Sequence, residues 1–83
     1  INIEARVSEI ARTSRGRLVA MLAAASRDIS AAEDTVSEAF ASALQKWPSD
    51  FPRNPEGWLM TVARNRLRDN AKSAFARTSV PLR

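Results

Sequence analysis

The sequence predicts an all-α fold, a compact bundle of three to four helices, and three observations lead to this prediction. The 83 residues suffice for one domain with a single core but not for two. Strong helix formers recur throughout, whereas Tyr is absent and Val, Ile and Thr are few. Apolar residues also recur with helical spacing in three stretches separated by turn signals.

The first helical stretch extends from Ile3 to about Arg27. Its apolar residues fall on one side of a 3.6-residue helix, which is predicted to face the core: Val7, Ile10, Ala11, Leu18, Met21, Leu22 and Ala25. Gly16 lies inside this stretch, and the sequence leaves open whether it is tolerated within one helix or separates two. The arginines of the stretch are predicted to lie on a solvated face.

The second stretch begins at Ser30, which forms a capping box with Glu33. Its predicted core face comprises Val36, Phe40, Ala43, Leu44 and Trp47. The helix is expected to end before Pro48, because a residue that precedes proline disfavours the helical conformation. The opposite face carries Asp34, Glu38, Ala41 and Gln45 in a row, which taken alone indicates only a solvated face.

The third stretch follows a loop over residues 49–53, in which Phe51 is expected to tuck under the chain. Asn54 is the predicted cap and Pro55 the first helical residue. The predicted core side is Leu59, Met60, Val62, Ala63, Leu67, Ala71 and Ala74. The opposite side presents a polar stripe made of Thr61, Arg64, Asn65, Arg68 and Lys72. This set can bond phosphate oxygens and base edges, although a solvated face stays a possible interpretation.

Charge is unevenly distributed along the chain, whose net charge is +4. Residues 1–29 carry five basic and three acidic groups, residues 30–57 two and five, and residues 58–83 six and one. A basic C-terminal third suits a polyanion, whereas an acidic middle suits a basic protein surface. The charge pattern therefore predicts two different partners.

Several classes of function are made improbable by residues that the sequence lacks. Without Cys or His there is no disulfide, no thiolate zinc site and no imidazole base, so we expect neither an enzyme nor a bound cofactor or metal. No apolar run approaches the ~20 residues that span a bilayer, and no signal peptide is recognisable, so we expect a soluble, cytoplasmic protein without a membrane partner. Residues 79–83 resemble the start of a linker, which suggests a domain trimmed from a longer protein.

Two blocks of the sequence resemble a known family. Residues 32–40 (AEDTVSEAF) resemble region 2.2 of the extracytoplasmic-function (ECF) sigma factors of bacterial RNA polymerase, and residues 54–69 (NPEGWLMTVARNRLRD) resemble their regions 2.3 and 2.4. The resemblance implies a sigma region 2 bundle over residues 1–78, comprising regions 1.2 to 2.4, and a C-terminal region 4 domain outside this chain. Such a domain binds core polymerase, and recognises and melts the promoter minus-ten element.

The resemblance also implies roles for individual residues. Asp34, Ser37, Glu38 and Gln45 would bind the clamp helices of the largest catalytic subunit, although Ser37 stands where the family usually has Gln. Thr61, Arg64, Asn65, Arg68 and Lys72 would bind the non-template strand, with Asn65 holding a flipped base and residues 49–53 forming part of its pocket. Trp58 would either wedge the duplex fork or pack in the core. An anti-sigma factor or an additional C-terminal domain would be a further partner.

Two other classes of function compete with this interpretation. A helix-turn-helix regulator would also be short, basic and helical, but the longer loop with Pro48, Pro52 and Pro55 does not match its tight turn. A helical protein-interaction module would explain both charged faces, but not an Asn and a Thr within the basic stripe. A preference for single-stranded over duplex DNA distinguishes a sigma domain from a regulator that reads duplex DNA.

Overall fold

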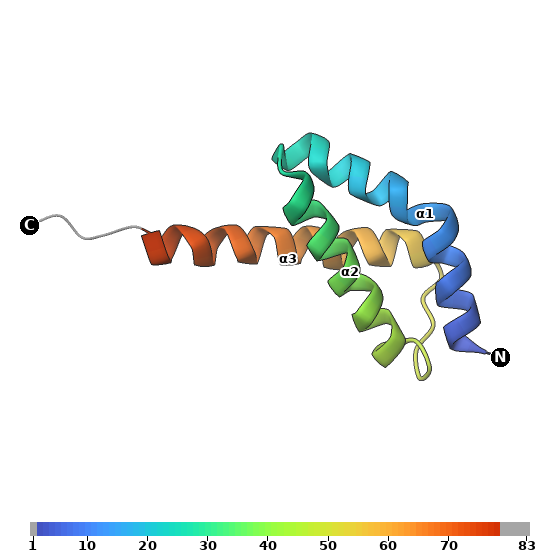
Figure 1. The fold of residues 1–83 in the computed structure, drawn as a ribbon. Helices are drawn as coiled ribbons and strands as arrows, with labels where there is room; N and C mark the ends of the chain where they lie inside the picture. The colour runs from blue at the N-terminus through green and yellow to red at the C-terminus, as the bar shows by residue number, and fades with distance from the viewer. Residues whose placement is uncertain (1, 79–83) are drawn as a thin grey trace, which may run out of the picture.

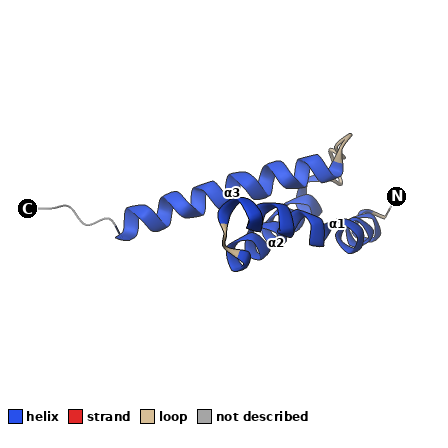
Figure 2. Cartoon of the chain, turned by 90° about the horizontal axis from the view of Figure 1, so that it is seen from above, coloured by secondary structure: helices blue, strands red, loops and turns tan. Residues whose placement is uncertain are grey.

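The computed structural model describes residues 2–78, with side chains described for residues 2–72. This range contains three helices, α1 (Ile3–Ser26), α2 (Ile29–Lys46) and α3 (Pro55–Thr78), and no strand (Figures 1 and 2). The all-α prediction is therefore confirmed. The expected linker at residues 79–83 and the side chain of Ala74 lie outside the described part.

The three helices form one packed unit in which α2 is central. α2 packs against both other helices, whereas α1 meets α3 over a smaller region. Figure 2 shows α3 lying across one side of the α1 and α2 pair, and Figure 1 shows its C-terminal half extending beyond that pair. As a result, α3 is anchored mainly through its first half.

α1 is one continuous helix, which settles the question that Gly16 left open. Asn2 caps it by accepting a 3.1 Å hydrogen bond from the backbone N–H of Ala5. Gly16 is exposed, and an added Cβ would meet no atom within 4 Å, so this glycine costs helix propensity but is not required by packing. Arg27 ends the helix in the left-handed conformation, with φ of 61°.

The start of α2 corrects the sequence prediction. Asp28, rather than Ser30, is the N-cap, and its Oδ1 accepts a 3.0 Å hydrogen bond from the N–H of Ala31. Asp caps a helix as well as Ser does, and capping at Asp28 leaves only Arg27 and Asp28 between α1 and α2. Ser30 therefore lies inside the first turn. The helix ends at Lys46, before Pro48, as predicted.

The predicted start of α3 is confirmed. Pro55 is its first residue, and Oδ1 of Asn54 accepts a 3.0 Å hydrogen bond from the N–H of Gly57. The fit around this cap is close, because a Cβ added at Gly57 would lie 2.7 Å from Nδ2 of Asn54. A side chain at position 57 would therefore force the Asn54 side chain to shift.

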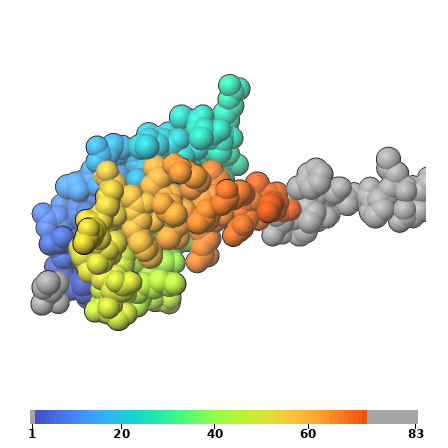
Figure 3. Space-filling view, turned by 180° about the vertical axis from the view of Figure 1, so that it is seen from behind, coloured from blue at the N-terminus to red at the C-terminus, as the bar shows by residue number. Residues whose placement is uncertain are grey.

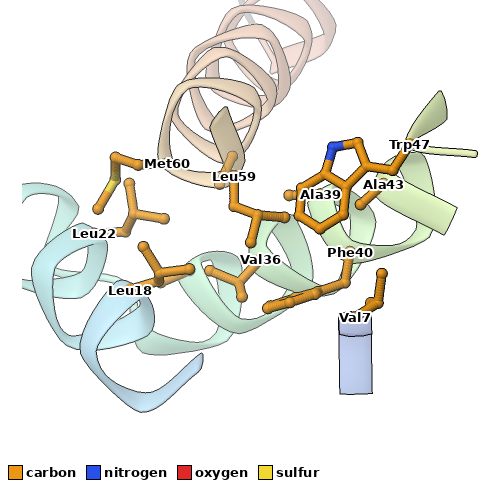
Figure 4. Packing of buried hydrophobic residues seen from close by; sticks show 12 residues of the cluster. Val7, Leu18, Leu22, Val36, Ala39, Phe40, Ala43, Trp47, Leu59 and Met60 are labelled. Carbon is orange, nitrogen blue, oxygen red and sulfur yellow. The ribbon is translucent and has the colours of Figure 1, made fainter. Parts of the chain in front are cut away.

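The core lies between the three helices and is centred on α2 (Figure 4). Its largest fully buried apolar side chains are Trp47, Leu18, Leu59 and Val36. Most predicted core residues are buried or half-buried, but four are exposed: Met21, Ala25, Leu44 and Ala71. Met21 and Leu44 lie at the edges of their apolar faces, Ala25 is in the last turn of α1, and Ala71 lies on the extending half of α3. On α1 and α3 the predicted core sides extend too far along the helix. On α2 the buried side is shifted from the predicted one, because Ala32, Thr35 and Ala39 are fully buried although they were not predicted as core residues.

Candidate nucleic-acid and protein interfaces

The polar stripe of α3 lies on the side of the helix that faces away from the core. Five side chains predicted to bind DNA are all exposed: Thr61, Arg64, Asn65, Arg68 and Lys72. Figure 3, which views the molecule from behind, shows α3 in yellow and orange across the face of the domain. The stripe is therefore accessible to a strand along its described length.

Two residues of the stripe contact each other. Nη2 of Arg68 donates a 2.6 Å hydrogen bond to Oδ1 of Asn65, one turn earlier on α3. The sequence placed both residues on one face, but it did not predict this contact. The signal was their i, i+3 spacing, which makes them neighbours on a helix surface.

Trp58 lies at the border between the stripe and the core. It is half-buried and packs against the core cluster. Its ring centroid lies 5.4 Å from that of the fully buried Trp47, with the two rings edge to face. This geometry favours packing over wedging, and such aromatic pairs contribute about 0.5–1.5 kcal/mol beyond their burial.

The polar face of α2 is connected to both neighbouring helices. Asp34 and Gln45 are exposed, in the middle of this face. Ser37 instead accepts a 2.8 Å hydrogen bond from Nη2 of Arg15 on α1. Glu38 is half-buried and lies 3.7 Å from Nη1 of Arg66 on α3.

The two arginines that hold this face, Arg15 and Arg66, were not predicted as functional residues. Nη2 of Arg66 also donates a 3.4 Å hydrogen bond to Oγ of Ser42, the residue one turn after Glu38 on α2. Both contacts join different helices, so a periodic pattern within one helix could not reveal them. The α2 face is therefore assembled by the fold as a whole.

The loop between α2 and α3 borders a cavity of about 530 Å³. The residues that line it are Ile3, Arg6, Trp47, Pro48, Ser49 and Phe51. Phe51 is partly exposed rather than tucked under the chain; its ring lies edge-on to Trp47 with centroids 5.1 Å apart, and the guanidinium of Arg6 lies 5.0 Å from it. Nε1 of Trp47 is buried without a hydrogen-bond partner among the described residues.

The cavity bears on the prediction that residues 49–53 form part of a base pocket. The loop does line a cavity, but the opposite wall comes from the N-terminal turns of α1. Among the described residues that line it, none belongs to the α3 stripe. The role of this loop in holding a base stays a prediction.

A polar contact fixes the beginning of α3 against α1. Glu56, in the first turn of α3, forms an ion pair with Arg17. Hydrogen bonds from the buried Ser14 and from Arg17 lower the pKa of Glu56 below its ordinary value. The carboxylate is therefore the form that holds the two helices together at neutral pH.

Two further observations concern membranes and metals. No helix in residues 2–78 is long and apolar enough to cross a bilayer. Within the same residues, no group of three or more potential side-chain ligands is placed to hold a metal ion.

Comparison with known protein families finds a match over most of the chain. The family model described as Sigma-70 region 2 matches residues 10–76, which include the greater part of α1, the whole of α2 and nearly all of α3. No curated protein and no solved structure matches the chain. The matched range contains every residue of the two candidate interfaces.

Proposed function

The chain belongs to the sigma-70 region 2 family, and from this premise we propose that it is the promoter-opening domain of an ECF sigma factor. Sigma-70 region 2 is a domain of sigma factors, which act in transcription initiation with core RNA polymerase and promoter DNA. In the proposal, residues 1–78 bind the polymerase and the minus-ten element in the cytoplasm, and residues 79–83 begin a linker to a region 4 domain. The domain makes and breaks no covalent bond.

The observation that carries the proposal is the separation of two polar faces onto two helices. The α3 stripe is exposed and cationic, with an amide and a hydroxyl among its cations. The α2 face carries Asp34 and Glu38. A polyanion and a basic protein surface can therefore bind at the same time without competing for one helix face.

The proposed role of α3 is to hold a strand that has left the duplex. An unpaired strand is stabilised when cations follow its backbone and one base is captured by a polar side chain. Arg64, Arg68 and Lys72 would contact phosphates, and Asn65 would bind the captured base. Thr61 offers a hydroxyl at the start of the same row, and Trp58 would border the fork from its packed position.

The proposed role of α2 is to dock on the clamp helices of the largest catalytic subunit. Asp34 and Glu38 would face basic residues, while Ser37 and Gln45 would provide hydrogen bonds. Charge complementarity of this kind sets register and association rate more than affinity. An anti-sigma factor, where one exists, would compete for one of these faces.

The proposal is tested with the 83-residue chain, with and without core RNA polymerase. We expect it to bind a single-stranded non-template oligonucleotide in preference to the same sequence as a duplex, and we expect core polymerase to strengthen this binding. Fluorescence anisotropy of labelled oligonucleotides measures both. Replacing Arg12, an exposed arginine on α1 outside both faces, by Met controls for the loss of one positive charge. Equal or stronger binding to the duplex would favour a helix-turn-helix type of regulator instead.

A further inference from the structure

We infer that Arg68 is a positioning residue, which orients the amide of Asn65 so that Asn65 reads the captured base as a hydrogen-bond donor. This inference rests on the proposed function of the α3 stripe. It goes beyond that proposal, in which the role of Arg68 is to contact phosphates. The added role rests on the 2.6 Å hydrogen bond between the two side chains.

The chemistry of the pair fixes the orientation of the amide. A guanidinium group carries five N–H donors and no acceptor, so only the oxygen of Asn65 can face Arg68. The bond is also charge-assisted, which makes it shorter and stronger than a bond between neutral groups. The Nδ2 group of Asn65 consequently points away from Arg68, and its two hydrogens are the groups presented to a ligand.

This orientation restricts what Asn65 can recognise. An amide that offers its oxygen and its nitrogen together pairs with adenine, through N6 and N7. The bond from Arg68 uses one lone pair of the oxygen and holds that oxygen toward Arg68, so the Nδ2 donors are the groups directed at the base, and they favour an edge that carries a carbonyl oxygen. Guanine, cytosine and thymine each have such an oxygen, whereas on adenine the acceptors N1 and N7 each lie beside the N6 donor, which would face the Nδ2 hydrogens. The geometry therefore predicts discrimination against adenine at the captured position.

Arg68 can do this and still contact the backbone. One N–H of its guanidinium is used by Asn65, and the other donors remain for a phosphate oxygen. A strand lying on the stripe would exclude water from the pair, and hydrogen bonds strengthen where the local dielectric falls. One side chain then links the phosphate contact to the orientation of the base-reading amide. Arg64, exposed on the same stripe, has no such link to Asn65 in the described structure.

The test measures base preference and affinity separately. The chain, bound to core RNA polymerase, is presented with a single-stranded oligonucleotide library randomised over six positions, and bound sequences are counted. Arg68→Met removes the charge and the donors but keeps most of the aliphatic stem, and Arg64→Met is the matched control. Asn65→Ala removes the amide, whereas Asn65→Asp can still accept from Arg68 but has no donor.

For the unmodified chain, we expect one position to disfavour adenine on the order of tenfold. Asn65→Ala and Asn65→Asp should both abolish this preference. Arg68→Met should reduce this preference about threefold or more. In the Asn65→Ala background, Arg68→Met should leave the base preference unchanged and weaken all sequences alike, through the loss of its phosphate contact. Arg64→Met should weaken all sequences alike. Circular dichroism checks that each variant keeps its helicity, which is expected because all three positions are exposed.

Three results would overturn the inference, and they can be told apart. If Arg68→Met preserves a base preference that Asn65→Ala abolishes, Arg68 does not position the amide, but the proposed function stands. If the preference that depends on Asn65 is for adenine, the amide is not restricted to its donors. If Asn65→Ala leaves the preference unchanged at all six positions, base capture by Asn65, and with it that part of the proposed function, is wrong.

Discussion

The two candidate interfaces are built differently, although each is a row of polar side chains on one helix. On α2, Ser37 is bonded to α1 and Glu38 is paired with α3. On α3, the contact described within the stripe is local, from Arg68 to Asn65. The α2 face is therefore linked to both neighbouring helices, whereas the contact described within the α3 stripe stays on one helix.

The two rows also differ in how firmly their helices are anchored. One side of α2 is buried against its neighbours along most of the helix, from Ala32 to Ala43. In α3, Leu59, Met60 and Ala63 are buried and Leu67 is half-buried, but residues 68–72 are all exposed. Thr61, Arg64 and Asn65 thus lie on the part of α3 that packs against the core. Arg68 and Lys72 lie on the part that extends past it. The comparison suggests a preformed surface for a protein and a more adaptable one for a strand.

The largest effect is expected from Leu59→Ala, because Leu59 is the fully buried anchor of α3. Its truncation should lower the free energy of unfolding by ~2–5 kcal/mol, measured by urea denaturation. Leu67→Ala, at the half-buried border, should cost clearly less. Equal losses at the two positions would contradict the division of α3 into an anchored and an extending half.

The next effect concerns salt. If Arg64, Arg68 and Lys72 each neutralise one phosphate, log affinity for single-stranded DNA should fall with log salt at a slope of about −2. Binding should therefore weaken roughly 20-fold between 50 and 200 mM salt. The slope is measured by anisotropy and should be less steep for Lys72→Met. An affinity that does not change with salt concentration would show that the cations of the stripe do not bind phosphates.

The α2 face is tested by reversing its charges. Asp34→Lys combined with Glu38→Lys should weaken binding to core RNA polymerase by about tenfold or more, since like charges across an interface are costly. Affinity is measured by titration with labelled core enzyme. Glu33→Lys, which reverses one exposed charge beside this face, is the control. Unchanged affinity in the double variant, with helicity retained, would show that the polymerase binds elsewhere.

The two glycines are expected to respond in opposite directions. Gly57→Ala should destabilise the domain by about 1 kcal/mol, because the new Cβ would force the capping side chain of Asn54 to shift. Gly16→Ala should stabilise it by ~0.5–1 kcal/mol, because the site is helical and open. Thermal unfolding measures both. If both substitutions stabilised the domain, the close approach between Asn54 and Gly57 would not hold in solution.

The smallest effect is expected from pH. The pKa of Glu56 is lowered by Ser14 and Arg17, so the stability that its carboxylate contributes is complete above the pKa of an unfolded glutamate. It is lost as the pH falls through the lower pKa of the folded state. Glu56→Gln should therefore flatten the acid side of the plot of melting temperature against pH. Identical curves for the unmodified chain and Glu56→Gln would argue against the contact.

Local signals in the sequence were sufficient for much of the fold. The end of α2 and the start of α3 are encoded locally. Pro48 ends α2, and Asn54 with Pro55 begins α3, as predicted. At the start of α2, Asp28 and Ser30 are both good N-cap residues. The cap is Asp28, which leaves a turn of two residues between α1 and α2. The exposure of Ala71 depends on where the neighbouring helices end, which no single-helix pattern contains.

The candidate site divides in the same way. The exposure of the α3 stripe was predictable from its spacing, because a helix with one apolar side must present the other. The contacts of Ser37 with Arg15 and of Glu38 with Arg66 depend on how three helices pack. The sequence therefore predicted the residues of the α2 face but not their contacts with α1 and α3. The roles of these residues toward polymerase and DNA stay predictions.

The two-residue turn between α1 and α2 has a consequence for the order in which the domain folds. Closing so short a loop costs little entropy, so we expect the α1 and α2 hairpin to form early, on the microsecond scale typical of helical pairs. α3 is joined through eight residues and is buried mainly over its first half. It should therefore dock late and detach first. Hydrogen exchange in the native state would then show the backbone that carries the stripe opening more readily than the helices beneath it.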